Sequence, residues 1–146
     1  MTDDEIHDFL RLRQTMNIAS FGPDGNIHLV AMWYGFLEGA VAFETKMKAQ
    51  KVVNLRRDPK LTALVEDGET YNTLRGVELV GTGTIVDDFD TIMELGVNVG
   101  VRYNGPAAGS DEARPFLEAQ ARKRLAVVIE VDKIVTWDHT KLGGTY

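Results

Sequence analysis

Residues 43–59 read FETKMKAQKVVNLRRDP and lead from the end of a strand pattern into a helix pattern. Lysines in the first turn of a helix face the positive end of its macrodipole, which disfavours them. Five basic against two acidic residues give the stretch a charge of +3, within a chain whose net charge is −6. The stretch therefore raises the question of what this positive charge binds. The five basic residues are Lys46, Lys48, Lys51, Arg56 and Arg57.

The bulk composition is ordinary for a soluble globular protein, with 44% hydrophobic and 26% charged residues. A length of 146 residues predicts one domain, residues 1–146. Cysteine is absent, which excludes disulfides, thiolate metal sites and a cysteine nucleophile. No apolar run approaches the roughly 18 residues of a membrane span, and the acidic start MTDDEIHDFL is unlike a signal peptide, so we expect a cytoplasmic protein. The negative charge argues against general nucleic-acid binding.

Hydrophobic periodicity and turn residues predict a mixed α+β chain. The runs HLVAMW at 28–33 and LAVVIEV at 125–131 are apolar on both faces, whereas a sheet with one solvated face alternates. We therefore expect a small barrel whose outer face is covered by helices or by a second subunit. Gly81 and Gly83 predict a bulge or bend in their strand. The expected elements are helices at 3–14, 46–58, 88–103 and 111–124, three strands within 16–45, strands at 60–67, 76–88 and 125–138, and a tail at 139–146.

Common catalytic and metal-binding motifs do not occur in the chain. The three histidines His7, His28 and His139 are scattered and lack metal-site spacing, so no bound metal is expected. There is no GxSxG, P-loop or GxGxxG motif. The basic clusters at 56–57 and 122–124 lie at the C-terminal ends of predicted helices, where the dipole stabilises them without any ligand.

The lysines at the start of the predicted helix 46–58 lack this support from the dipole. Thr45 is a suitable N-cap, but the residue three positions on is Lys48 rather than the Glu or Gln of a capping box. One interpretation is that Lys46, Lys48 and Lys51 are solvated surface charges. The other is an anion site, in which free N–H groups at the helix start and one or two ammonium groups converge on a phosphate.

The run at 28–68, HLVAMWYGFLEGAVAFETKMKAQKVVNLRRDPKLTALVEDG, resembles the core of the split β-barrel flavin-binding proteins related to pyridoxamine 5′-phosphate oxidase. It is most similar to their actinobacterial branch, the oxidoreductases that use the deazaflavin coenzyme F-420. The matching features are MWY in one strand, FET ending another, lysines opening the next helix, and NLRRDPKLTALVE. RGVELVGTGTIVDD and WDHTKLGGTY extend the resemblance over nearly the whole chain. Motifs for pyridoxal phosphate are not recognisable, so vitamin B6 oxidation is not expected.

The resemblance implies an α+β split β-barrel with flanking helices, and a homodimer with cofactor sites at the subunit interface. It also implies that Lys48 and Arg56 reach the carboxylates of the F-420 oligoglutamate tail, which FMN lacks. The cofactor-binding residues expected from the resemblance are Thr45, Lys46, Lys48 and Lys51 around the phosphate, Ala31, Met32 and Trp33 along the ring system, and Arg56 at the tail.

The resemblance thus implies an oxidoreductase in which reduced F-420 gives a hydride to a small electron-poor acceptor, such as an enone or quinone. Catalytic residues are unknown, and Tyr71 and Tyr103 are only candidates for proton transfer. The alternatives are an FMN-dependent oxidoreductase of the same fold and a non-catalytic carrier of the cofactor. A haem-binding protein ranks last, because His28 is the one evident axial ligand.

Overall fold

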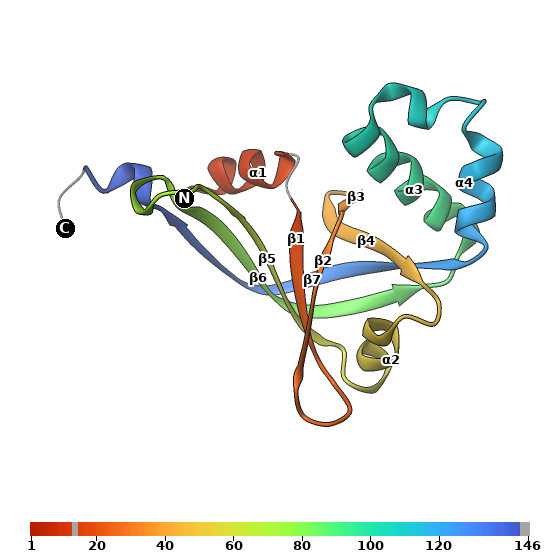
Figure 1. Ribbon diagram of the computed structural model, residues 1–146, viewed down its shortest axis with the longest axis horizontal. Coiled ribbons are helices and arrows are strands. Elements are labelled where there is room, and N and C mark those ends of the chain that lie inside the picture. The colour runs from red at the N-terminus through yellow and green to blue at the C-terminus, as the bar shows by residue number, and fades with distance from the viewer. Residues whose placement is uncertain (13–14, 144–146) are drawn as a thin grey trace.

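Seven antiparallel strands form one curled sheet in the computed structural model, which describes residues 1–12 and 15–143 (Figure 1). The strand order is β2-β1-β5-β6-β7-β4-β3, so β2 and β3 form the two edges. This half-barrel confirms the predicted α+β split barrel. The strands are β1 (Met16–Phe21), β2 (Ile27–Met32), β3 (Gly35–Leu37), β4 (Ala40–Lys46), β5 (Lys60–Asp67), β6 (Arg75–Val86) and β7 (Arg124–Asp138).

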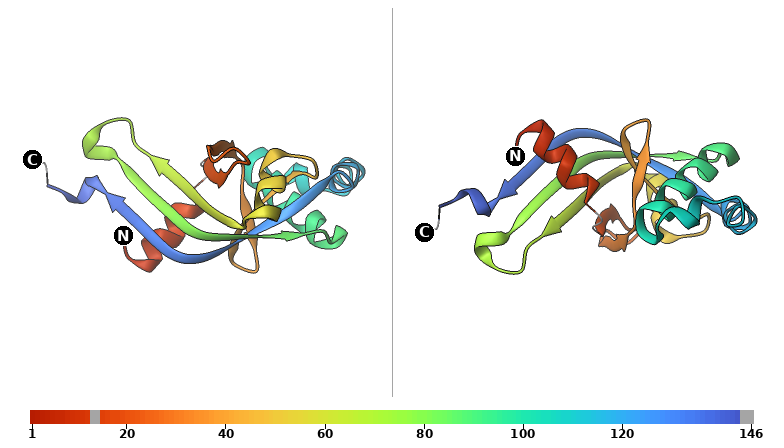
Figure 2. Two further views of the ribbon diagram at one scale, coloured as in Figure 1. Left: turned by 90° about the horizontal axis from the view of Figure 1, so that it is seen from below. Right: turned by 90° about the horizontal axis from the view of Figure 1, so that it is seen from above.

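Four α-helices and three short 3₁₀ helices surround this sheet. In Figure 1, α2 lies on one side of β4 and the α3–α4 pair lies on the other. Figure 2 shows that α1 lies toward the end of the long strands β6 and β7 that is far from α3 and α4. The helices are α1 (Asp3–Arg11), α2 (Gln50–Arg57), η1 (Tyr71–Thr73), α3 (Phe89–Asn104), η2 (Pro106–Gly109), α4 (Arg114–Ala121) and η3 (His139–Lys141).

The prediction of three strands within residues 16–45 was wrong, because four strands form there. After β2, residues 33 and 34 turn the chain away from β1, and the short β3 pairs with β4 instead. The β3–β4 turn places Glu38 at φ 49° and Gly39 at φ 85°, as a two-residue hairpin turn requires. The strands β2 and β3, which follow each other in the sequence, therefore lie at opposite edges of the sheet.

Three predicted helices are shorter than expected: α1, α4 and, as described with the site below, α2. α1 ends at Arg11, and residues 13–14 of the predicted helix, like residues 144–146 of the predicted tail, lie outside the described residues. α4 begins at Arg114 rather than at residue 111, with a proline in its first turn, and ends at Ala121. The prediction that residues 122–124 end a helix was therefore wrong, and Arg124 begins β7. Asp88 is the N-cap of α3, and its side chain accepts a hydrogen bond from the Thr91 amide.

The core lies against the inner face of the sheet in two adjoining clusters. Tyr34 is fully buried in the larger one, and its hydroxyl donates a 2.7 Å hydrogen bond to the Leu10 carbonyl at the end of α1. Burial raises the pKa of the Tyr34 hydroxyl to about 12. The larger cluster includes Phe9, Met16, Ile18, Phe43, Leu55, Val65, Val77, Leu79 and Val127, and the smaller includes Leu37, Ala42, Ile92, Leu95 and Ala126.

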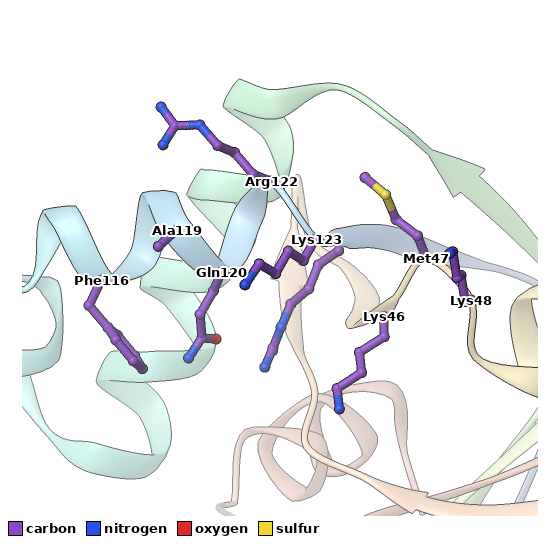
Figure 3. Close-up of a pocket in the computed structure, with 9 residues that line it drawn as sticks. Lys46, Met47, Lys48, Phe116, Ala119, Gln120, Arg122 and Lys123 are labelled. Carbon is purple, nitrogen blue, oxygen red and sulfur yellow. The ribbon is translucent and has the colours of Figure 1, made fainter.

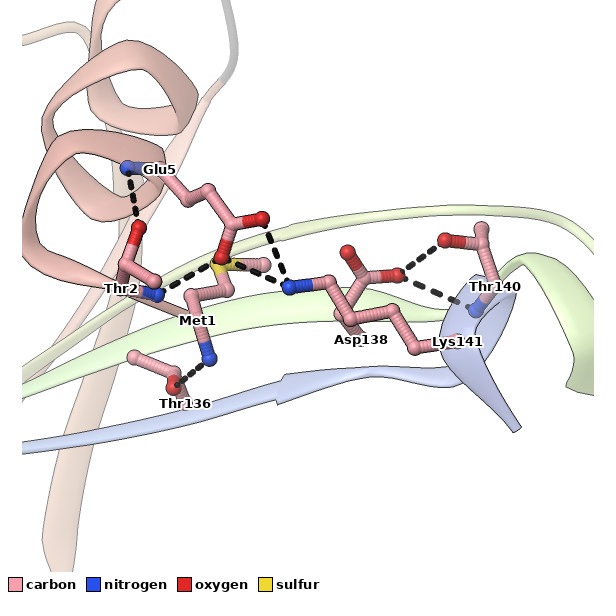
Figure 4. Close-up of polar contacts among 7 residues, drawn as sticks. All are labelled: Met1, Thr2, Glu5, Thr136, Asp138, Thr140 and Lys141. Carbon is pink, nitrogen blue, oxygen red and sulfur yellow. Dashed lines mark hydrogen bonds and ion pairs between the residues drawn. The ribbon is translucent and has the colours of Figure 1, made fainter.

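Polar contacts hold the start of α1 against the end of β7 (Figure 4). Glu5 and Thr2 form a capping box, and Lys141 donates to both Glu5 carboxylate oxygens at 2.6 and 2.7 Å. The amino group of Met1 donates to the Thr136 hydroxyl at 3.0 Å. The bonds from Lys141 and from the Thr2 amide lower the pKa of Glu5 to about 2. The stabilisation that these contacts of Glu5 give the fold is therefore fully present above the ordinary carboxyl pKa of 4.5. It is lost as the pH falls through about 2.

The outer face of the sheet is also largely apolar over β1 and β2, whereas β5 and β6 add polar residues such as Lys60, Thr62 and Glu78 to it. The register aligns Ala19 of β1 with Leu29 of β2 and Thr62 of β5, which fixes the residues that share this face. Leu29 is 67% and Ile27 57% exposed. The strands that are apolar on both faces thus contribute one face to the core. Their other face is an apolar surface that none of the described helices covers. We call this surface the outer sheet face; its apolar residues are Ala19, Phe21, Ile27, Leu29, Ala31, Leu64 and Val80.

A β-bulge interrupts the pairing of the two longest strands between Val80 and Gly81, which confirms the bulge predicted from Gly81. A Cβ on Gly81 would lie 1.9 Å from the carbonyl oxygen of Glu130. Gly83 serves packing instead, since a Cβ there would lie 2.7 Å from the Leu61 side chain. The bulge therefore depends on a residue without a side chain.

We expect Gly81→Ala to lower the free energy of unfolding by about 3 kcal/mol, because backbone must move to admit the methyl group. Denaturant unfolding measures this change. Gly100→Ala is the matched control. A Cβ on residue 100, which lies within α3, would be 3.4 Å from the Cβ of Ala108, and alanine favours a helix over glycine by up to about 1 kcal/mol. Equal stability of the two variants would contradict the proposed tight pairing.

Candidate functional site

The end of β4 presents charged side chains on one face of the sheet and a hydroxyl on the other. β4 pairs with β7 so that Lys46 lies opposite Arg124. Because side chains alternate along a strand, Glu44 and Lys46 share a face, whereas Thr45 points the other way and is 4% exposed. Glu44 and Arg124 form an ion pair at 3.3 Å.

Lys51 is a buried cation in the first turn of α2. Its side chain reaches back toward β4, where Nζ donates a 3.2 Å hydrogen bond to the Thr45 hydroxyl, and the residue is 9% exposed. Among the described residues no carboxylate forms an ion pair with it. Burial lowers the pKa of the Lys51 ammonium. The charge of Lys51 is therefore left for a further partner to balance.

The helix that carries Lys51 begins later than the sequence suggested. α2 starts at Gln50, and its N-cap Ala49 offers no side-chain hydrogen bond to the first amides. Thr45 is consequently not the N-cap, because pairing with β7 extends the strand through residue 46. Lys48 lies in the turn between β4 and α2, so it does not share a helix face with Lys51. The start of α2 remains uncapped and without an acidic residue in its first turn.

These elements enclose a pocket of about 250 Å³, which we call the phosphate pocket. Three cations, Lys46, Lys51 and Arg124, come from three different elements, and the uncapped start of α2 adds the positive end of its dipole. Charged donors of this kind fit the oxygens of a phosphate group. The structure thus brings together four of the predicted site residues. The full lining is Met32, Glu44, Thr45, Lys46, Ala49, Lys51 and Arg124.

The sequence analysis missed Glu44 and Arg124 as site residues. The triplet at 122–124 looked like a helix end, although the apolar run of β7 would have admitted one further residue at its start. Burial raises the pKa of the Glu44 carboxyl, and the Arg124 guanidinium acts in the opposite direction. Arg124 therefore serves the site twice, as a partner of a buried acid and as a donor into the pocket.

A second pocket of about 670 Å³ adjoins the first, and Figure 3 shows its lining residues. We call it the basic groove. α4 and the link to β7 form one side, and the end of β4 forms the other. Of its nine lining residues five are cations and none is acidic, and Lys46 and Arg124 also line the phosphate pocket. The lining is Lys46, Met47, Lys48, Phe116, Ala119, Gln120, Arg122, Lys123 and Arg124.

A third pocket, of about 290 Å³, lies between α3, η2, α4 and β4, and we call it the helical pocket. Trp33 lines it and is 50% exposed. The Trp33 ring stacks on Tyr103 of α3 with ring centroids 4.5 Å apart and planes within 1°. Glu44 and Arg124 line both this pocket and the phosphate pocket. The three pockets are therefore neighbours around the end of β4.

Arg102 supports the aromatic pair from behind. Its guanidinium carbon lies 5.5 Å from the Tyr103 ring centroid and 4.6 Å from that of Tyr34. The same guanidinium donates to the carbonyls of Leu10, at 2.8 Å, and of Arg11, at 3.1 Å. A cation at the C-terminal end of α1 is also favoured by the helix dipole. Arg102 therefore ties α1 to the helix that bears Tyr103.

The remaining predicted residues lie apart from the phosphate pocket. Ala31 belongs to the outer sheet face, and Arg56 is exposed in the last turn of α2, outside all three pockets described here. Tyr71 lies in η1, where its ring is 4.6 Å from that of His139. His28 lies on β2 opposite Ser20 and has a buried Nδ1 without a hydrogen-bond partner among the described residues.

Across residues 1–12 and 15–143 there is no group of three or more His, Asp or Glu side chains placed to hold a metal ion. No helix in the same ranges is long and apolar enough to cross a membrane.

Comparison with known proteins places these features in context. The family model described as pyridoxamine 5′-phosphate oxidase matches residues 2–138. A conserved hypothetical protein from Mycobacterium tuberculosis, Rv2991, is 44% identical over all of this chain and 90% of its own, with a TM-score of 0.94. No curated protein sequence matches.

More distant solved structures share the fold. An F420 reductase is 22% identical, with a TM-score of 0.68 over 88% of this chain and 94% of its own. A haem storage protein from Vibrio cholerae, HutZ, is 14% identical, with a TM-score of 0.68 over 93% of each chain. At these identities the likeness extends to the fold alone.

The unbalanced charge of Lys51 can be tested without any cofactor. We expect Lys51→Met to raise the free energy of unfolding of the ligand-free protein by about 1 kcal/mol, because a buried charge is replaced by an apolar side chain. Inorganic phosphate should raise the Tm of the wild type, through binding to the folded state, and leave that of the variant unchanged. Differential scanning calorimetry measures both effects.

The exposed Lys48 provides the control for this experiment. Lys48→Met should change the free energy of unfolding by less than about 0.5 kcal/mol and keep the response to phosphate. If Lys51→Met destabilises the protein, or if both variants respond to phosphate like the wild type, Lys51 is not an unbalanced charge in an anion pocket.

Proposed function

The chain belongs to the pyridoxamine 5′-phosphate oxidase family, and on this premise we propose that it is an oxidoreductase that binds the deazaflavin coenzyme F-420. Reduced F-420, when bound, supplies a hydride from its C5 position to a small electron-poor acceptor of the enone or quinone type. The shared fold of an F420 reductase agrees with this choice among the cofactors of the family. The protein contributes binding, orientation and exclusion of water.

The observation that carries the proposal is the buried Lys51 without an acidic partner in the described residues. A ribityl phosphate in the phosphate pocket would balance this charge and accept hydrogen bonds from Thr45, Lys46 and Arg124. It would also satisfy the free amides at the start of α2. The site thus offers donors from β4, α2 and β7 to one anion.

The ring system of the coenzyme is proposed to lie along the end of β2 and the residue after it. Met32 lines the phosphate pocket and Trp33 lines the helical pocket, so a molecule with its phosphate at Lys51 would extend past these two residues. Proximity between the bound ring and an acceptor is the main catalytic contribution that these residues would make.

The basic groove is proposed to hold the oligoglutamate tail of F-420. It adjoins the phosphate pocket at Lys46 and offers Lys48 and Lys123 to carboxylates, with no acidic residue in its lining. Arg56 lies outside the groove, and its predicted role in tail binding stays a prediction. FMN would fill the phosphate pocket but leave the groove empty, so the groove favours F-420 over FMN.

We expect Lys51→Ala to weaken F-420 binding about ten- to a hundred-fold, because one charge-assisted hydrogen bond to the phosphate is lost. The change should appear in a titration followed by the fluorescence of the coenzyme. Wild-type affinity should fall as salt rises, and that of the variant should fall less. Lys60→Ala, an exposed lysine on β5, should bind like the wild type.

The same titration separates the alternatives. Weaker binding of F-420 stripped of its glutamates supports the role of the basic groove, and equal binding excludes it. Tighter binding of FMN would identify the protein as an FMN-dependent enzyme, and spectral binding of haem would point to a haem protein. If F-420 binds but reduced F-420 is not oxidised by any of a panel of enones and quinones, the protein is a carrier.

A homodimer is the second part of the proposal. The outer sheet face exposes neighbouring apolar side chains on β1 and β2, including Phe21, Ile27 and Leu29, and a second copy of the chain would cover them. Ala31 belongs to this face, whereas the next residue, Met32, lines the phosphate pocket on the opposite face of β2, so the expected position of the coenzyme at the interface stays a prediction. The cytoplasmic location expected from the sequence stays a prediction.

We expect light scattering to give the mass of two chains for the wild type and of one chain for Leu29→Glu, because the charge would be buried at the interface. Val53→Glu, which alters an apolar residue on α2 that is 50% exposed, should remain dimeric. A wild-type monomer at micromolar concentration would contradict the interface. Dimeric Leu29→Glu would place the interface elsewhere.

A further inference from the structure

The helical pocket is the most distinctive cavity that the cofactor-binding proposal leaves without a ligand. It adjoins the phosphate pocket through Glu44 and Arg124, and it adjoins the proposed ring position through Trp33. A ligand in it would therefore lie next to the ring of the bound coenzyme. Hydride transfer requires such a neighbour, since the reacting atoms must approach within about 3.5 Å.

Several residues that line this pocket have small side chains or none, and larger side chains there would reduce its volume. Gly96 lets α3 approach β4, because a Cβ there would lie 3.0 Å from Oε1 of Glu44. Gly100 faces Ala108 of η2, whose Cβ would lie 3.4 Å from a Cβ on Gly100. Glycines inside a helix weaken it, so α3 gives up helical stability where it borders the pocket. The resulting volume of about 290 Å³ is at the small end for ligand sites and fits one or two fused rings.

The walls of the pocket favour a flat, electron-poor ligand. Tyr103 covers one side of the Trp33 ring and does not line the pocket, which leaves Trp33 half-exposed toward it. Phe116 of α4 adds a second ring and is 64% exposed. Aromatic rings prefer offset stacking with other rings, and an electron-poor ring complements the electron-rich face of a stacked tryptophan.

The polar groups of the pocket favour a neutral molecule with carbonyl groups. Glu44 and Arg124 neutralise each other at 3.3 Å, so no net charge asks for an ionic ligand. Gln120 of α4 lines the pocket beside Arg124, and its amide can donate to a carbonyl oxygen, as can the guanidinium nitrogens that Glu44 does not use.

We propose that the helical pocket is the acceptor site, and that it takes a small planar ring with conjugated carbonyl groups, of the quinone or cyclic enone class. This inference rests on the proposed function. The acceptor gains a hydride from the reduced coenzyme and one proton from water, which turns a quinone into its hydroquinone, while the coenzyme is oxidised. The helices α3 and α4, rather than the sheet, thereby set which acceptors are used.

The probe for the first test is 1,4-naphthoquinone, and Trp33 is the reporter. In the full-length Trp137→Phe protein Trp33 is the only remaining tryptophan, and the absence of cysteine prevents thiol addition to the quinone. We expect saturable quenching of Trp33 fluorescence. Ala108→Leu, which fills the pocket, should weaken the probe at least ten-fold. Ala107→Leu, the same change at the exposed neighbour on η2, should leave it within two-fold.

Quenching that rises linearly without saturation, or equal affinity in the two leucine variants, would overturn the proposal. Equilibrium dialysis of the probe against the same variants in the Trp137 background gives the affinity independently, in case Trp137→Phe fails to fold. In the holoprotein, Ala108→Leu should keep F-420 affinity and lower kcat/KM for naphthoquinone at least ten-fold.

The outcomes also separate this inference from the proposed function. Loss of F-420 binding in Ala108→Leu would show that the coenzyme itself fills the pocket, which overturns the acceptor assignment. Absence of F-420 binding in the wild type would overturn the proposed function, while the naphthoquinone titration would still decide whether the pocket takes a planar carbonyl ring.

Discussion

The pairing of β4 with β7 is the constraint on which the site depends. It sets Lys46 opposite Arg124 and carries the strand one residue past the point where a helix could have begun. The turn that follows places Lys51 so that it points back to Thr45. Since Glu44 shares a strand face with Lys46, the same pairing also fixes the ion pair that separates two pockets. Backbone hydrogen bonds thus determine the charge pattern.

Two ionisable side chains in the site differ in whether an opposite charge balances them. Lys51 is buried with the Thr45 hydroxyl as its hydrogen-bond partner, whereas the Glu44 side chain, 8% exposed, has Arg124 beside it. Burial disfavours the charged form of both, lowering the pKa of the lysine and raising that of the acid. An incoming anion would relieve the first group and leave the second pair intact. The ligand-free site is therefore strained electrostatically in one place, and that place is where the phosphate is proposed.

Local patterns in the sequence predicted most elements and the basic stretch, because strand alternation, turn glycines and the family resemblance are properties of neighbouring residues. They did not predict that α2 begins at Gln50, because Thr45 is a good N-cap and only pairing with a distant strand removes it. Arg124 was assigned to a helix for the same reason. The stack of Trp33 on Tyr103 joins residues far apart in the chain, which no periodicity reveals.

Arg102 couples the attachment of α1 to the shape of the helical pocket. It binds the carbonyls at the end of α1 and packs under Tyr103, which in turn supports Trp33. Substitutions that tighten α1 against heat would therefore also stiffen the wall of the helical pocket. If the helical pocket binds acceptors as proposed, selection for thermostability would narrow the range of acceptors, and selection for bulkier acceptors would weaken the attachment of the N-terminal helix.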